Sequence, residues 1–202
     1  MAFLRITKNN TMKNIFLSTA LAALTTAGMA QTSWVIDKTH SNIGFTATHM
    51  VIAEVSGSFK DTDIKVSSTA EDFNGASVEF VAKVSSIDTQ NEMRDGHLKS
   101  DDFFNAEKFP EIKFSGKLVK SGKTYNAVGK LTLRDVTKDV TFPVTYLGTI
   151  KTAKFTKAGF KLTGSINRFD YNLKWSNKLE TGGLVVGETV QLAANIELNL
   201  AN

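Results

Sequence analysis

Hydrophobic and polar residues alternate along most of the chain from Trp34 onward. A period of two places every second side chain on the same face of a β-strand, so such a run indicates a strand with one buried face. The longest run ends the chain. Its apolar face carries Val190, Leu192, Ala194, Ile196, Leu198 and Leu200.

Shorter runs of the same kind recur between clusters of Gly, Asn, Asp and Ser, which is typical of antiparallel all-β domains. They bring the expected number of strands to about eight. Eight antiparallel strands can close into a barrel whose interior is either filled by side chains or holds a small ligand. The remaining runs are residues 43–49, 58–66, 78–84, 112–118, 131–133, 142–146 and 160–166.

One insertion, residues 89–109, has no period-two stretch. Thr89 and Glu92 fit a capping box, which predicts a short helix over about 90–99. Ser100 is expected to cap a further turn, through residue 104. The pattern fits either a lid over one barrel mouth or ordinary core packing. The side chains expected to press the insertion onto the barrel are Phe103, Phe104 and Phe109.

The first thirty residues have the pattern of an export signal. Lys13 supplies a positive charge, residues 15–24 a short apolar stretch, and residues 28–30 a small-x-small cleavage site. The apolar stretch is too short for a spanning helix, so we expect cleavage after Ala30 rather than a membrane-anchored N-terminus. Met12 would itself make an ordinary start.

Residues 31–202 are then expected to form one domain, without a repeat or a low-complexity linker. The formal net charge is +4, but three basic residues and no acidic ones lie in residues 1–30. The remainder has 21 basic and 20 acidic side chains, a net charge of +1. A nearly neutral domain lacks the basic surface that nucleic-acid binding requires, so we exclude that class.

Catalytic chemistry has no positive support in the sequence. The chain has no cysteine, no G-x-S-x-G nucleophile elbow and no phosphate-binding glycine loop. Its histidines, His40, His49 and His97, match no zinc-binding spacing. We therefore predict no catalytic residue, no metal site and no cofactor.

Two arginines, Arg94 and Arg168, stand close to apolar or aromatic residues, where a guanidinium must find partners. Arg94 could pair with the adjacent Asp95 and fix the insertion. Alternatively, an arginine at the mouth of an apolar cavity would bind an anionic or carbonyl head group. The same two interpretations apply to Arg134 and Lys138.

Large aromatic side chains are more numerous than one small barrel needs to fill itself. If the centre is open, a prenyl or acyl chain would gain about 0.8 kcal/mol per buried CH2 group. If it is filled, the protein is a stable scaffold. The side chains concerned are Phe45, Phe59, Phe80, Phe114, Phe142, Phe160 and Trp175.

Several motifs, in order along the chain, resemble the YceI family. They are Trp34-x-Ile36-Asp37-x-x-His40-Ser41-x-Ile43-x-Phe45-x-x-x-His49, Ile87-Asp88-Thr89, Arg94-Asp95-x-His97-Leu98-x-Ser100-x-Asp102-Phe103-Phe104, Phe109-Pro110-x-Ile112-x-Phe114, Gly129-x-Leu131-Thr132, Val136-Thr137-Lys138 and Ile166-Asn167-Arg168. The resemblance covers essentially all of residues 31–202. Departures are Asp135, where the family commonly has glycine, and Asn105, where aspartate is common.

This resemblance implies an eight-stranded antiparallel lipocalin-like barrel with a short helical insertion, in the periplasm rather than secreted. It also implies binding, carriage or storage of a polyisoprenoid, isoprenoid quinone or related long-chain lipid, without covalent chemistry or a stable membrane anchor. A homodimer is left open. The lipid-binding residues expected from motifs and strand faces are Phe45, His49, Phe59, Phe80, Arg94, His97, Phe103, Phe104, Phe114, Phe142, Phe160, Arg168 and Trp175.

Two alternatives belong to different functional classes. One is an enzyme that modifies a lipid or quinone with His97 or His49 as the acid or base. The other is a stress-response structural or interaction protein whose barrel is filled. A continuous apolar cavity would count against the second alternative, and unchanged bound lipid would count against the first.

Overall fold

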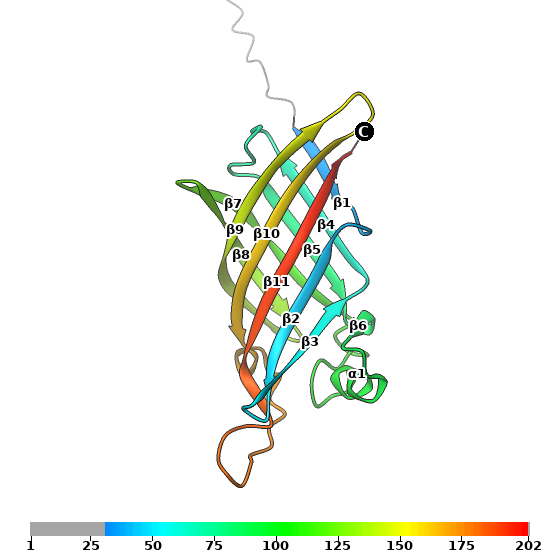
Figure 1. The fold of residues 1–202 in the computed structure, drawn as a ribbon, viewed down its shortest axis with the longest axis vertical. Coiled ribbons are helices and arrows are strands. Elements are labelled where there is room, and N and C mark those ends of the chain that lie inside the picture. The colour runs from blue at the N-terminus through cyan, green and yellow to red at the C-terminus, as the bar shows by residue number, and fades with distance from the viewer. Residues whose placement is uncertain (1–30, 202) are drawn as a thin grey trace, which may run out of the picture.

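A computed structural model describes residues 31–201, so the predicted signal peptide lies outside the described residues. Strands dominate this part of the chain (Figure 1). They are β1 (Thr32–Ile36), β2 (Asn42–His49), β3 (Ala53–Phe59), β4 (Thr62–Ser68), β5 (Ser77–Lys83), β6 (Ile87–Asp88), β7 (Glu111–Ser121), β8 (Thr124–Leu133), β9 (Val136–Lys151), β10 (Thr156–Asn167) and β11 (Val186–Leu200). The helices are η1 (Val84–Ser86), α1 (Glu92–Lys99) and η2 (Arg168–Tyr171).

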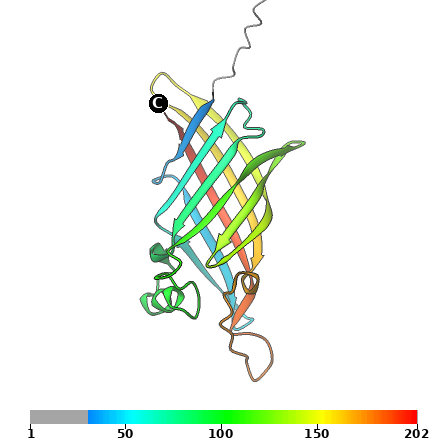
Figure 2. The same ribbon diagram turned by 180° about the vertical axis from the view of Figure 1, so that it is seen from behind.

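Eight of these strands close into an antiparallel barrel in the order β1-β4-β5-β7-β8-β9-β10-β11, with β11 returning to β1. The closing pair joins the two ends of the described chain, with Trp34 opposite Leu200. Figure 2 shows the same wall from behind. The predicted all-β, eight-stranded barrel with a short helical insertion is confirmed.

The long strand β11 has two partners along the same edge. Its first part, from Val186 to Asn195, pairs with β2, and its last part pairs with β1. Strands β2, β3 and β6 therefore extend the wall below β1 and β4 (Figure 1). The prediction of one strand over 58–66 is wrong, because the chain turns a corner at Lys60 and Asp61, where it leaves β3, the partner of β2, and enters β4, the partner of β1.

The insertion contains the predicted short helix, but its cap is different. The Asn91 side chain accepts a hydrogen bond from the Arg94 backbone N–H at 2.9 Å, so Asn91 rather than Thr89 is the N-cap. Gln90, just before the helix, has a left-handed backbone conformation, with a φ of 62°. Beyond Ser100 the chain forms turns, not another helical turn. Among residues 31–201, no helix is long and apolar enough to span a bilayer.

An aromatic cluster fills one end of the barrel. Phe73, only 1% exposed, lies 5.1 Å from both Trp34 and Phe160 and 5.6 Å from Tyr146, between ring centroids. Tyr125 joins the cluster and donates its hydroxyl proton to the Asp72 carbonyl oxygen. This closed end also holds both ends of the described chain (Figure 1). The opposite end, which holds α1 and residues 172–185, is called the entrance end below.

Candidate binding cavity

A cavity of about 240 Å³ lies inside the barrel. Inward-facing side chains of β2 to β5 and β7 to β11 line it, together with the insertion residues Leu98, Phe103 and Phe104. Arg168 is the one charged residue in this lining. The alternative of a filled barrel predicted no such cavity, and the structure contains one.

The aromatic cluster borders the cavity at the closed end. The cavity lining there includes Phe160, which belongs to the aromatic cluster. Towards the other end the lining reaches Ala47, Val186 and the half-buried Phe104. We infer that the cavity opens at the entrance end, which the insertion, the turn between β2 and β3 and the loop of residues 172–185 surround.

The structure separates the thirteen predicted binding residues into two groups. Nine line the cavity, and four stand outside the lining. The lining group is Phe45, Phe59, Phe80, Phe103, Phe104, Phe114, Phe142, Phe160 and Arg168. The outer group is His49, Arg94, His97 and Trp175.

Arg168 is 2% exposed, and its guanidinium donates hydrogen bonds to backbone carbonyl oxygens. Nε donates to Gly187 at 2.9 Å, Nη1 to Leu173 at 2.5 Å and to Trp175 at 2.8 Å, and Nη2 to Val186 at 2.9 Å. Burial lowers the pKa of this guanidinium from its ordinary value. The arginine therefore ties both ends of the 172–185 loop to the end of β10.

Two predicted residues outside the lining, His97 and Trp175, join the insertion to that loop. The His97 ring lies 5.0 Å from Phe103 and 5.3 Å from Trp175 between centroids, both edge to face. Phe103 and Trp175 lie 5.4 Å apart. His97 Nε2 also contacts Asp102 Oδ2 at 2.8 Å. This stack, named the aromatic seam, holds two separate segments together at the entrance end.

Arg94 and Asp95 meet at Thr89, not at each other as an ion pair. The Thr89 hydroxyl donates to Asp95 Oδ1 at 2.5 Å and accepts from Arg94 Nε at 2.7 Å. Arg94 Nη2 also donates to the Thr89 carbonyl oxygen at 2.6 Å. Thr89 is 4% exposed, and the three residues fix the start of the insertion through partly buried hydrogen bonds.

Arg134, for which the sequence leaves a structural and a binding role open, supplies a second link. Its Nη1 donates to the carbonyl oxygens of Asp101 at 3.0 Å, Phe103 at 2.6 Å and Asn172 at 3.4 Å. The guanidinium also lies 5.6 Å from the centroid of the Phe109 ring. The insertion and the 172–185 loop are thus held by an arginine as well as by the aromatic seam.

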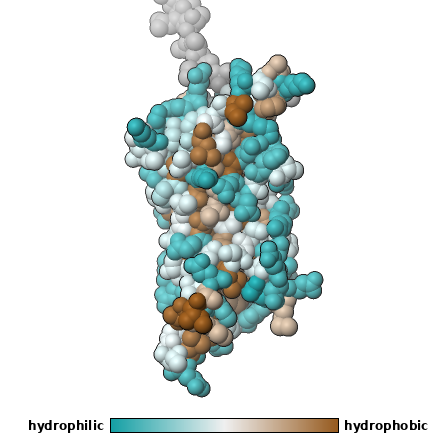
Figure 3. All heavy atoms as spheres, in the orientation of Figure 1, coloured by the Kyte–Doolittle hydropathy of each residue, from teal (hydrophilic) through white to brown (hydrophobic). Residues whose placement is uncertain are grey.

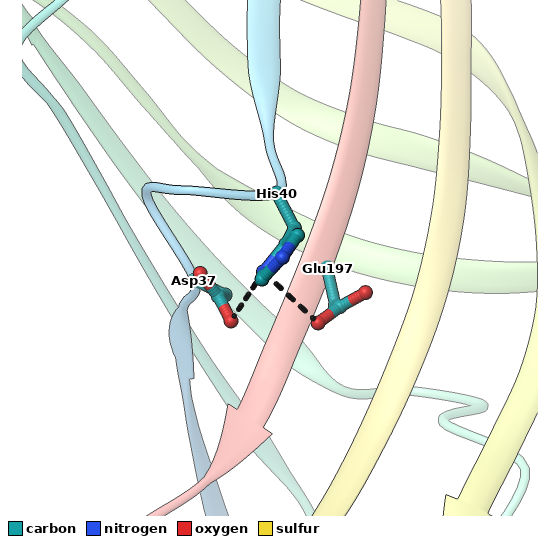
Figure 4. A group of neighbouring side chains, drawn as sticks. All are labelled: Asp37, His40 and Glu197. Carbon is teal, nitrogen blue, oxygen red and sulfur yellow. Dashed lines mark hydrogen bonds and ion pairs between the residues drawn. The ribbon is translucent and has the colours of Figure 1, made fainter.

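A polar cluster at the corner between β1 and β2 unites residues far apart in the sequence (Figure 4). Asp37, His40 and Glu197 each offer one side-chain atom that could bind a metal ion, and these atoms lie within 4.8 Å of one another. The Lys157 ammonium group reaches the same place, 2.7 Å from Asp37 Oδ2 and 2.5 Å from Glu197 Oε1. A metal ion could bind there only if Lys157 withdrew. The barrel closure, which the motifs do not describe, brings these groups together.

Asp37→Asn is expected to lower the melting temperature by about 5 °C at pH 7. Hydrogen bonds from Lys157, and then from Thr39 and His40, hold the pKa of the Asp37 carboxyl well below its usual value of 3.8. Because the pKa of this carboxyl is lower in the folded than in the unfolded protein, the ionised group stabilises the fold fully above the unfolded pKa. The stabilisation decreases as the pH falls from the unfolded pKa towards the folded pKa. The difference between the two proteins in thermal unfolding should therefore shrink below about pH 3.8.

Asp139→Asn is the matched control for this prediction. Asp139 pairs with Lys130 at 2.9 Å, but its side chain is 84% exposed, so its loss should change the melting temperature little at any pH. A pH-independent difference for Asp37→Asn would contradict the ionic explanation.

Comparisons with known proteins agree with this architecture. The YceI-like domain model matches residues 34–198. A UPF0312 protein of Staphylococcus aureus (strain N315) is 36% identical over 172 residues, which are 84% of this chain and 99% of that protein. The crystal structure of Campylobacter jejuni YceI protein is 30% identical with a TM-score of 0.66, over 83% of this chain and 97% of that one.

Two more distant structures share the fold. Burkholderia cenocepacia BcnA has a TM-score of 0.68 at 23% identity, over 80% of this chain and 98% of that one. A domain of Saccharophagus degradans, described as polyisoprenoid-binding and implicated in plant cell wall breakdown, has a TM-score of 0.58 at 15% identity. The match covers 83% of this chain and 98% of that domain.

Proposed function

The chain belongs to the family of YceI-like domains, and from that premise we propose that it binds and carries or stores a long isoprenoid lipid in the periplasm. The single observation that carries the proposal is the apolar cavity inside the barrel. A long apolar chain gains about 0.8 kcal/mol for each CH2 group that leaves water, so a few isoprene units suffice for tight binding. The polyisoprenoid ligand class named for the Saccharophagus degradans domain is consistent with this proposal.

The lining residues divide the work of recognition. Phe80, Phe114 and Phe142 offer apolar surface to the prenyl chain in the barrel interior. Phe104 lies towards the entrance, where the head group of a chain inserted tail first would remain. His97, Trp175 and Arg94 act indirectly, because they hold the segments that frame the entrance.

Binding without covalent chemistry is the version of the function that the site supports. His97 is engaged by Asp102 and by the aromatic seam, and neither His97 nor His49 lines the cavity. A general acid or base must reach the reacting group of a bound substrate. The periplasmic setting rests on the export pattern of residues 1–30.

Native mass spectrometry of the protein, purified without detergent from the cell envelope of its own host, tests this proposal. We expect a stoichiometric adduct that solvent extraction releases as an unmodified prenyl lipid. Protein stripped of lipid should regain the adduct after incubation with a polyprenol or an isoprenoid quinone. A protein that carries no adduct and takes up none of these lipids would falsify the carrier function, and a chemically altered lipid would favour an enzyme.

A further inference from the structure

The turn between β2 and β3 exposes three consecutive apolar side chains. Met50 is 43% exposed, Val51 61% and Ile52 90%. Met50 and Val51 also have left-handed backbone conformations, with φ of 50° and 68°. That conformation is unfavourable for a β-branched residue, and such strain persists only where the surroundings impose it. These three residues are called the apolar tip.

The apolar tip adjoins the cavity entrance. Figure 3 shows a hydrophobic patch at the end of the molecule where β2 and β3 meet. The Met50 backbone N–H donates to the Val185 carbonyl oxygen at 2.8 Å. A Cβ atom added to Gly183 would lie 2.7 Å from Val51 Cγ2, so the tip also touches the 172–185 loop. Ala47, three residues before Met50, and Val186, which pairs with His49 across the β-ladder, both line the cavity.

A second exposed apolar residue stands at the same end of the barrel. Met93, on α1, is 87% exposed. Apolar side chains therefore stand on two of the segments that surround the entrance. Their position matters because a long prenyl lipid resides in a membrane. If it crossed water to reach the cavity, it would first pay the free energy of exposing its apolar chain to water, which binding in the cavity would then recover.

We propose that the apolar tip docks the entrance end onto a lipid bilayer, so that lipid passes between bilayer and cavity without crossing water. This docking rests on the proposed function, which supplies the lipid to be transferred. The bilayer is chosen as the partner because the apolar tip adjoins the entrance of the cavity that holds this lipid. Apolar side chains of this kind insert at the boundary between head groups and acyl chains. Val51 packs on the loop, while Met50 and Ile52 enter the bilayer.

The closed end provides a matched control. Leu147 is 60% exposed and Ile150 65%, both on β9. They have the same apolar character as the tip but belong to a strand whose end lies away from the entrance (Figure 1). Neither residue lines the cavity. If exposed apolar surface alone caused membrane association, both pairs of residues would contribute.

The test compares Met50→Ser/Ile52→Ser with Leu147→Ser/Ile150→Ser and the wild type. Flotation with phosphatidylcholine vesicles measures docking, and extraction of a fluorescent polyprenol from those vesicles measures transfer. Farnesol added from water measures the cavity alone. We expect the tip variant to lose about tenfold in vesicle binding and in extraction rate, and to keep farnesol affinity within about twofold. The control variant should match the wild type in all three.

Three outcomes would overturn the docking proposal. The tip variant could bind vesicles as well as the wild type, or the control could lose as much as the tip variant. Light scattering could also show a wild-type dimer that the tip variant converts to a monomer, which would make a second copy the occupant. Failure of every protein to bind farnesol or polyprenol, with vesicle binding still dependent on the tip, would reject the lipid-carrier function and retain the docking.

Discussion

Ala194→Phe is expected to weaken the binding of a long lipid roughly 100-fold while the barrel still folds. Ala194 is 8% exposed, lines the cavity from β11 and stands between Ile43 and Leu162 in neighbouring strands. A phenyl ring there enters a cavity of about 240 Å³ and displaces part of the bound chain. If about four CH2 groups lose their place, the loss is about 3 kcal/mol, or roughly 100-fold in affinity.

Titration with a polyprenol, with the circular dichroism spectrum as a check of folding, measures this effect. Gln191→Phe is the matched control, because Gln191 lies on the same strand, is exposed and does not line the cavity. It should bind lipid like the wild type. Full lipid affinity in a folded Ala194→Phe protein would place the lipid elsewhere than in this cavity.

Arg168→Leu is expected to lower the free energy of unfolding by about 3 kcal/mol, and the melting temperature by about 10 °C. The substitution removes the donor for four carbonyl oxygens, those of Leu173, Trp175, Val186 and Gly187. A buried acceptor without a donor carries its full desolvation cost. We therefore expect the 172–185 loop to open first.

Thermal unfolding gives the size of this effect, and amide hydrogen exchange gives its place. Protection should fall in residues 172–187 before it falls in β7 and β8. Lys174→Leu removes an exposed cation from the same loop and should change stability by less than about 0.5 kcal/mol. Arg168→Lys should recover only part of the loss, because one ammonium group cannot reach four acceptors arranged around a planar fork. Complete recovery by lysine would show that charge alone matters.

The barrel and most of its interior could be predicted because they depend on the alternation of inward-facing and outward-facing side chains along each strand. Phe45 and Phe114 lie inward because the alternation around them has a buried face, and β11 is the longest clear run. The alternation does not reveal where one strand ends and the next begins without a marked turn. The corner at Lys60 and Asp61 contains no glycine, proline or asparagine and only a single aspartate, so the alternation continues through the corner as if it were one strand.

The entrance end was harder to predict, because backbone groups and irregular segments build it. Arg168 binds four carbonyl oxygens, which no side-chain pattern can indicate. Trp175 meets His97 only because two loops without periodicity come together. Thr89 fits a capping box, yet it forms partly buried hydrogen bonds to Arg94 and Asp95, and Asn91 is the N-cap.

The pairing of β1 with the last residues of β11 also determines when the protein can finish folding. Trp34 meets Leu200, so the first strand of the barrel waits until the end of the last strand is available to pair with it. During this time the unclosed sheet has free edges and an uncovered apolar face, the conditions under which chains aggregate. Loss of residues 198–200 would remove every residue of β11 that pairs with β1 and would leave this edge of the sheet open.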